Sequence, residues 1–191
     1  MAHPSTADQL RRAPAAVQLE EHPDGSIVLR SAMPLLPYAR CVGDYLQRWA
    51  KEGPERLFLA ERSAGGWREI RYGETLDMVR TIAAHLLDRG LSADQPLMIL
   101  SGNGINHALL GLAAMHVGIP VVPVSTAYSL LSKDFAKLKA IATLTQPRMI
   151  YAAEGERYTK ALEAVSSGSV EVICDSSDGS RSCFSDLLTA I

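Results

Sequence analysis

The sequence predicts an α/β protein built around a doubly wound, mostly parallel sheet with helices on both faces. From residue 97 onward, short apolar segments alternate with helical ones, and the loops between them are short. Such alternation is typical of β-α-β units with right-handed crossovers. The apolar segments are rich in Val, Ile and Leu and uncharged at their centres, as strands covered on both faces are. We expect strands at 97–101, 121–124, 148–152 and 170–174, and helices at 106–117, 132–143, 156–166 and 183–190.

The first part of the chain predicts less regular structure. Residues 1–25 are rich in Ala, Pro and charge and show no sustained period, so we expect a mobile arm there, with one domain from residue 26 to residue 191. Residues 26–31 can form a short strand. Residues 42–51 have the apolar spacing of a helix. The apolar face of this helix is expected to carry Val42, Tyr45, Leu46 and Trp49.

A β-hairpin and a helix are predicted between this region and the sheet. Residues 57–63 and 67–72 have strand composition and flank the turn Ala64-Gly65-Gly66. An amphipathic helix follows at 74–89, and Gly90 is suited to the left-handed position that ends it. Its inward face is expected to carry Leu76, Val79, Ala83, Leu86 and Leu87.

Composition excludes several classes of function. The 191 residues carry a net charge of −2 with acids and bases interspersed, so no basic surface for nucleic acid or membrane is expected. No apolar run approaches the ~18–20 residues of a membrane span, and the amino terminus lacks the apolar stretch of a secretory signal. The three cysteines are scattered and odd in number, which argues against a disulfide framework. We therefore expect a cytoplasmic protein with reduced thiols.

The loop at 101–107 resembles a dinucleotide-binding loop, yet it fails two tests. Gly102-Asn103-Gly104 follows a strand and opens a helix, but the third glycine of G-x-G-x-x-G is His107. The next strand ends at Ser125 without the carboxylate that would bind a ribose hydroxyl. Walker and nucleophile-elbow motifs are absent from the chain as well. We expect a tight turn in which Asn103 and Asn106 cap the helix. The loop nevertheless lies at the carboxyl end of a strand, where such sheets usually bind ligands.

Metal and phosphate sites have weak signals. His107 and His116 are nine residues apart, on roughly opposite faces of a helix, and no ligand cluster of the usual spacing is present, so no metal site is expected. Arg157 and Lys160 lie three apart at the start of a predicted helix and project from one face. They can form either an ordinary solvated pair, as charged helix faces usually do, or a phosphate-binding pair.

Several segments resemble the early part of adenylate-forming (AMP-binding) enzymes. The resemblance rests on Arg71-Tyr-Gly-Glu-Thr-Leu76 after the hairpin, Ser101-Gly-Asn-Gly104, the apolar helix that ends in Gly118, and Pro120-Val-Val-Pro-Val-Ser125. Within that superfamily the chain most resembles bacterial feruloyl-CoA synthetases. The narrower resemblance is carried by residues 37–41, 113–120 and 125–130.

This resemblance implies an ATP-dependent aryl-acid–CoA ligase. In such enzymes a hydroxycinnamic or other aryl acid reacts with Mg·ATP to give an acyl-adenylate and pyrophosphate, and CoA then displaces AMP. The superfamily's phosphate loop, ribose-binding aspartate and carboxy-terminal lysine have no counterpart in these 191 residues. We therefore expect an amino-terminal part of a larger domain, inactive alone, with no catalytic residue and no tight binding of ATP, Mg²⁺ or CoA.

By its position after the strand at 148–152, the resemblance assigns Arg157 and Lys160 to a CoA phosphate. The alternative to the whole interpretation is a stand-alone, non-catalytic α/β domain that binds a partner.

Overall fold

The computed structural model describes residues 16–166, 168–176 and 181–189, and the chain divides into one unit up to Tyr38 and a second from Ala39 onward. The first unit is an antiparallel hairpin of β1 (Val17–Glu21) and β2 (Ile27–Ser31), whose turn places Gly25 at φ +83°. Strand β2 confirms the strand expected at 26–31. Strand β1 lies within the range 1–25, where we expected a mobile arm. Only a few residues alternate there between apolar and polar types, so the sequence did not indicate a strand. The first fifteen residues of that arm lie outside the described part of the chain.

The second unit begins with four elements that the sequence predicted: helix α1 (Val42–Glu52), strands β3 (Leu57–Ser63) and β4 (Gly66–Arg71), and helix α2 (Tyr72–Asp88). The two strands pair as an antiparallel hairpin. Gly90, just past α2, has the expected left-handed φ of +78°.

Some predicted inward residues of the two helices are wrong. In α1, Leu46 is buried with Gly43 and Ala50, whereas Val42 and Tyr45 are exposed. In α2, Leu87 is half exposed, at 50%. The buried stripe of α2 runs through Val79, Ile82, Ala83 and Leu86, and a step of one residue turns a side chain by about 100° away from it.

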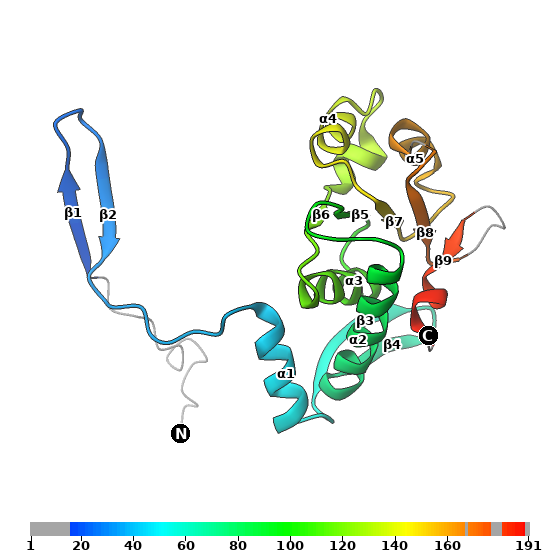
Figure 1. Ribbon diagram of the computed structural model, residues 1–191, viewed down its shortest axis with the longest axis horizontal. Helices are drawn as coiled ribbons and strands as arrows, with labels where there is room; N and C mark the ends of the chain where they lie inside the picture. The colour runs from blue at the N-terminus through cyan, green and yellow to red at the C-terminus, as the bar shows by residue number, and fades with distance from the viewer. Residues whose placement is uncertain (1–15, 167, 177–180, 190–191) are drawn as a thin grey trace, which may run out of the picture. The chain divides into compact units, whose positions relative to one another are not determined.

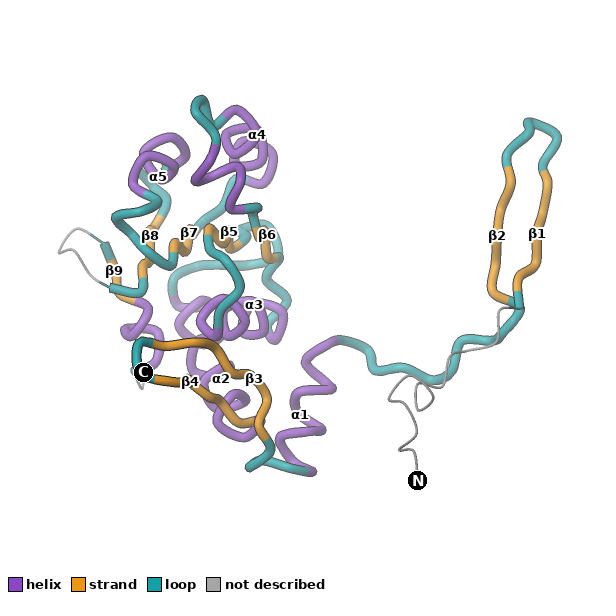
Figure 2. Tube along the Cα trace, turned by 180° about the vertical axis from the view of Figure 1, so that it is seen from behind, coloured by secondary structure: helices purple, strands orange, loops and turns teal. Residues whose placement is uncertain are grey.

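The sheet has five parallel strands in the order β6-β5-β7-β8-β9 (Figures 1 and 2). The strands are β5 (Leu97–Leu100), β6 (Val121–Pro123), β7 (Met149–Ala152), β8 (Glu171–Cys174) and β9 (Ser182–Cys183). The predicted α/β class and its parallel sheet are confirmed. Strand β9 has only two residues and was not predicted, since so short a segment carries no period.

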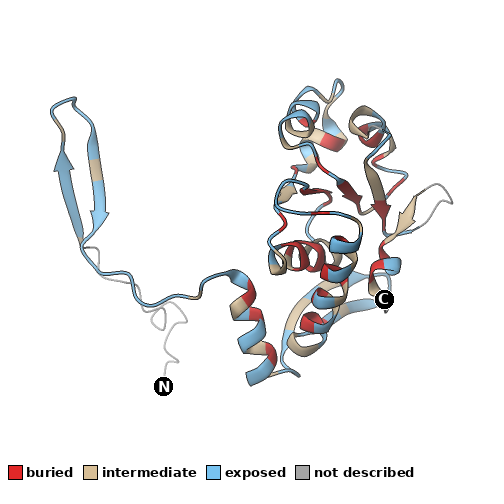
Figure 3. Cartoon of the chain, viewed as in Figure 1, coloured by how far each residue is buried: buried red, intermediate tan, exposed pale blue. Residues whose placement is uncertain are grey.

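Helices cover both faces of the sheet, with a separate hydrophobic cluster on each side (Figure 3). Helices α2 and α3 (Ile105–His116) and a 3₁₀ helix (Phe184–Leu188) pack on one face. Helices α4 (Ala136–Thr145) and α5 (Thr159–Val165) and a π-helical turn (Ala127–Leu131) pack on the other. Strands β5 and β7 lie between these layers and are wholly buried. No helix in the described ranges is long and apolar enough to span a membrane.

Three predicted helices differ from the structure at their ends. The helix expected at 132–143 begins at residue 136, because the Asp134 carboxylate and the Ser132 hydroxyl accept hydrogen bonds from the N–H groups of Ala136 and Phe135 and form a turn first. The helix expected at 156–166 begins at Thr159, after a turn. The helix expected at 183–190 is the short 3₁₀ helix, and residue 190 lies outside the described residues.

Candidate functional site

A crevice of about 380 Å³ lies at the carboxyl ends of the central strands. Strand β5 pairs with β6 on one side and with β7 on the other, so the chain reverses its winding direction between β5 and β7. The loop after β5 therefore leads to one face of the sheet and the loop after β7 to the other, which opens a gap between them. Open α/β sheets bind their ligands at this switch point. The expectation that the loop at 101–104 faces a ligand position is consistent with this placement.

A chain of hydrogen bonds runs along one wall of the crevice. Glu61 and Arg68, which are cross-strand partners in the β3–β4 hairpin, form an ion pair at 3.0 Å. The Arg68 guanidinium also donates to Asn106 Oδ1 at 2.9 Å. Asn106 Nδ2 in turn donates to Asp175 Oδ1 at 2.8 Å, and the Tyr151 hydroxyl donates to the same oxygen at 2.6 Å. We call these five residues the polar relay. It connects the hairpin, helix α3 and the ends of β7 and β8.

Tyr151 is held protonated by its surroundings. Its side chain is 1% exposed, in the middle of the sheet. Burial raises the pKa of the phenol well above its usual value, and the hydrogen bond to the Asp175 carboxylate raises this pKa further. Tyr151 is therefore a permanent donor to Asp175 at neutral pH.

The amino terminus of α3 is capped from another part of the fold. Neither Asn103 nor Asn106 caps the helix, and that expectation was wrong: the N-cap residue is Gly104, without a side-chain hydrogen bond. The Glu61 carboxylate instead accepts the N–H of Ile105 at 2.8 Å. A Cβ on Gly104 would lie 3.0 Å from Glu61 Oε2, so a glycine leaves room for this approach. Sequence reasoning missed Glu61 because 44 residues separate it from the helix end.

His107 faces the loop that precedes its helix. Its Nδ1 lies 2.8 Å from Ser101 Oγ and 3.2 Å from the Gly102 carbonyl oxygen. The side chain lines the crevice and also a neighbouring pocket of about 330 Å³ against the β3–β4 hairpin. The imidazole thus braces the turn at 101–104.

The structure separates the two basic residues proposed for phosphate binding. Arg157 lines the crevice from the turn before α5, where it forms an exposed ion pair with Glu154 at 2.9 Å. Such pairs contribute about 0–1 kcal/mol. Lys160 is exposed on the first turn of α5 and is not among the lining residues of the crevice. Arg157 therefore precedes the helix, whereas Lys160 lies within it.

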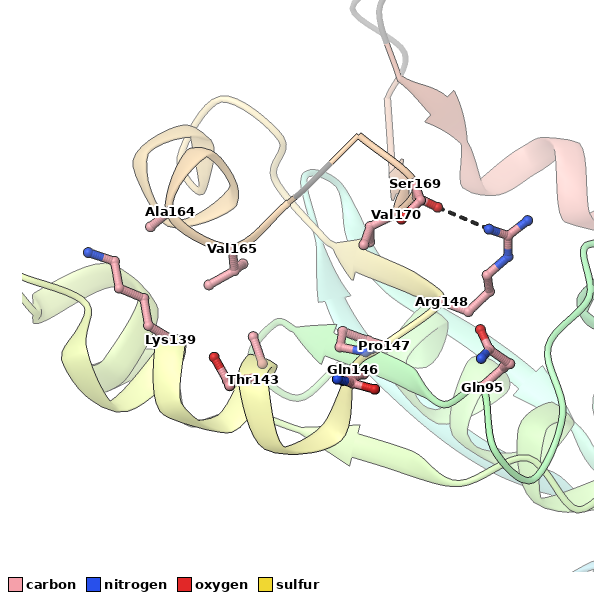
Figure 4. A pocket seen from close by; sticks show the side chains of 11 residues that line it. Gln95, Lys139, Thr143, Gln146, Pro147, Arg148, Ala164, Val165, Ser169 and Val170 are labelled. Atoms are coloured by element: carbon pink, nitrogen blue, oxygen red, sulfur yellow. Dashed lines mark hydrogen bonds between the residues drawn. The ribbon is translucent and has the colours of Figure 1, made fainter.

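A second, larger pocket lies at the opposite ends of the strands. It has a volume of about 620 Å³ and runs between α4 and α5, with Lys139 and Arg148 at its two ends (Figure 4). Arg148 donates to the Ser169 carbonyl oxygen at 3.0 Å and so closes one end. This pocket is remote from the polar relay, and amino ends of parallel strands are not the usual ligand position.

Possible metal ligands are not clustered in the described residues. Across 16–166, 168–176 and 181–189, no group of three or more His, Cys, Asp or Glu side chains lies close enough together to hold a metal ion.

Three solved enzyme structures are among those that share this fold. The luciferase-like enzyme from the mealworm Zophobas morio matches with a TM-score of 0.66 at 16% identity, over 79% of this chain and 34% of that one. A benzoate CoA ligase from Burkholderia xenovorans matches with a TM-score of 0.63 at 19% identity, over 78% of this chain and 28% of that one. A fatty acyl-adenylate ligase from L. pneumophila matches with a TM-score of 0.54 at 16% identity, over 67% and 21%.

This chain therefore spans about a third or less of the length of these structures. No curated protein matches the sequence. The family model described as AMP-binding enzyme matches residues 46–186, which include the β3–β4 hairpin, the five-stranded sheet and every residue of the polar relay. The chain belongs to the AMP-binding enzyme family.

Proposed function

We propose that this chain is the amino-terminal part of a cytoplasmic, ATP-dependent aryl-acid–CoA ligase of the feruloyl-CoA synthetase type. Such an enzyme converts a hydroxycinnamic or other aryl acid, ATP and CoA to acyl-CoA, AMP and pyrophosphate. The match of the AMP-binding model to residues 46–186 is the observation that carries the proposal. Support for the narrower class comes from the resemblance of residues 37–41, 113–120 and 125–130 to feruloyl-CoA synthetases.

The described residues of the crevice do not fit Mg·ATP. Arg68 is held by Glu61 and Asn106, which leaves Arg157 as the one arginine of the described lining that can be exchanged onto a phosphate, and a single cation does not match a triphosphate with its metal ion. The lining contains no lysine. We therefore assign no step of the ATP chemistry to these side chains. In our proposal the chain supplies the sheet and loops, and the phosphate-binding groups belong to a longer protein.

The CoA-phosphate assignment of Arg157 and Lys160 is part of this proposal. Arg157 supports it best, because it lines the crevice and its exposed pair with Glu154 can be exchanged for a phosphate at little cost. Lys160, three residues further on and outside the lining of the crevice, would add a second positive charge.

Kinetics of the longer enzyme test this assignment. Arg157→Ala with Lys160→Ala should raise the KM for CoA severalfold and leave the KM for ATP unchanged. Arg80→Ala is a matched control, because Arg80 forms a comparable exposed i,i+3 ion pair on α2. An unchanged KM for CoA in the double variant would show that the two residues do not bind a CoA phosphate and are an ordinary solvated pair.

Pyrophosphate exchange tests the proposed function itself. The reading frame that contains this chain should continue through a Ser/Thr/Gly-rich phosphate loop with a lysine, and its full product should catalyse exchange in the presence of ferulate or another aryl acid. Residues 1–191 alone should show none, because preorganised donors for the developing phosphate charge are the main source of catalysis. Exchange by the short chain would mean that the active site is misplaced.

The alternative of a stand-alone, non-catalytic α/β domain makes the opposite prediction. It requires a reading frame that ends near residue 191 and a stable, monodisperse product of that length. Our proposal instead expects a marginally stable chain that associates, because a truncated sheet leaves an edge and apolar surface uncovered.

A further inference from the structure

Asp175 presents one carboxylate oxygen to the crevice while the other is held from within the fold. The residue follows β8 and lines the crevice with an exposed side chain. Its Oδ1 accepts both hydrogen bonds, from Tyr151 and from Asn106. Its Oδ2 bonds to no residue in the described part of the chain. Two donors on one oxygen fix the direction of the other.

The two donors are themselves fixed. Tyr151 lies in a buried strand and can only donate at neutral pH. Asn106 cannot turn its amide around, because its Oδ1 already accepts an N–H from Arg68 and its Nδ2 must therefore face Asp175. Backbone bonds hold the residue as well: the Asp175 N–H donates to the Ala153 carbonyl oxygen at 3.2 Å. Supporting hydrogen bonds of this kind orient a group that contacts a ligand.

We propose that Asp175 is a binding residue of the crevice, whose Oδ2 accepts a hydrogen bond from an amino or hydroxyl group on the nucleotide part of CoA. Asn106 and Tyr151 act as positioning residues. A nucleotide suits the crevice because it carries anionic phosphate for Arg157 and N–H and O–H donors for Asp175, and both residues line the same cavity. The inference rests on the proposed function and adds a residue to it.

A comparison of CoA with pantetheine in the longer enzyme tests this role, because pantetheine has the same thiol and lacks the nucleotide. Asp175→Asn keeps an acceptor for Tyr151 and Asn106 but replaces Oδ2 by an amide nitrogen, which cannot accept. We expect kcat/KM for CoA to fall about tenfold, as loss of one hydrogen bond to a charged group would cause. The value for pantetheine and the KM for ATP should not change. Asp94→Asn, at an exposed carboxylate in the turn before β5, is the control and should change neither.

The outcomes separate this inference from the proposed function. A wild-type enzyme that uses CoA no better than pantetheine overturns the nucleotide site altogether. A wild-type enzyme that prefers CoA, with an Asp175→Asn variant that keeps this preference, overturns only the role of Asp175. An equal fall in kcat/KM for CoA and for pantetheine would show that Asp175 supports the fold and does not bind the nucleotide, which overturns its proposed role as well. If Asp175→Asn does not fold, Tyr151→Phe takes its place, because it removes one donor that orients Asp175 and keeps the carboxylate. This variant should lower kcat/KM for CoA and leave kcat/KM for pantetheine unchanged. A variant that lowers neither value, or both equally, would reject the inference.

Discussion

Asn106→Asp is the sharpest test of the polar relay, because it changes one atom in the middle of it. The substitution replaces the Nδ2 donor by an oxygen that faces Asp175 Oδ1 at the wild-type separation of 2.8 Å. The lost bond is a hydrogen bond to a charged acceptor, worth about 1.5–3 kcal/mol. The added repulsion between carboxylates amounts to about 1.5 kcal/mol in a water-like dielectric and to several times more at lower values. Because the Asp175 side chain is exposed, the water-like dielectric applies and the repulsion is about 1.5 kcal/mol.

Arg68 offsets part of this cost. Its guanidinium lies 2.9 Å from Asn106 Oδ1 and would gain an ion pair with the new carboxylate. Attraction and repulsion act over nearly the same distance, so they largely cancel, and the lost hydrogen bond remains. We therefore expect a loss of about 2 kcal/mol in the free energy of unfolding at pH 7. Urea unfolding followed by circular dichroism measures this difference. Asp175→Asn in the same chain should restore part of it by removing the second charge.

The pH dependence of this defect has a definite sign. At low pH the new carboxyl group at position 106 is protonated and again donates to Asp175, so the folded state holds this proton more tightly and raises the pKa of the carboxyl group above the unfolded value of about 3.9. The folded chain then binds more protons than the unfolded chain, so stability falls as pH rises through the raised pKa. The defect of Asn106→Asp should be small near pH 4 and full at pH 7. A cost below about 0.5 kcal/mol at pH 7, or one that does not vary with pH, would refute the reasoning that the Asn106–Asp175 bond couples the two segments.

Three further changes have expected outcomes. Glu61→Ala removes the acceptor for the Ile105 N–H and should cost about 1 kcal/mol in urea unfolding, whereas Glu61→Gln, which keeps an oxygen there, should cost less. Gly155→Ala places a Cβ 2.9 Å from the Cys174 sulfur, so a loss of about 1–3 kcal/mol is expected, and no loss would show that α5 moves freely. Tyr151→Phe should reduce the loss of unfolding free energy at alkaline pH. The raised pKa of the phenol contributes stability that is present below about pH 10 and is lost as pH rises above it. A variant whose unfolding free energy falls with pH as steeply as that of the wild type would contradict this.

Local pattern alone determined the class of fold and most of its elements. The run Leu97–Leu100 is apolar throughout and lies between Pro96 and Ser101, and the run Met149–Ala152 is uncharged and follows Arg148, so their burial in a parallel sheet could be predicted. Gly90 marked the end of α2 correctly. Alternation of strand and helix with short loops then implied helices on both faces of the sheet. The placement of a loop at the carboxyl end of β5, and thus the general position of the crevice, followed from the same pattern.

Only the tertiary structure decided which side chains meet in the crevice. The hydrogen bonds of Asn106 to Arg68 and to Asp175 span 38 and 69 residues, and the cap of α3 comes from Glu61 in a separate hairpin. No period or spacing in one sequence encodes such pairs, because the packing of the β3–β4 hairpin against α2 and α3 brings them together. Arg157 and Lys160 show the converse. They are three residues apart and were expected on one helical face, but α5 begins only at Thr159; Arg157 lines the crevice from the turn before it, and Lys160 is not among the lining residues.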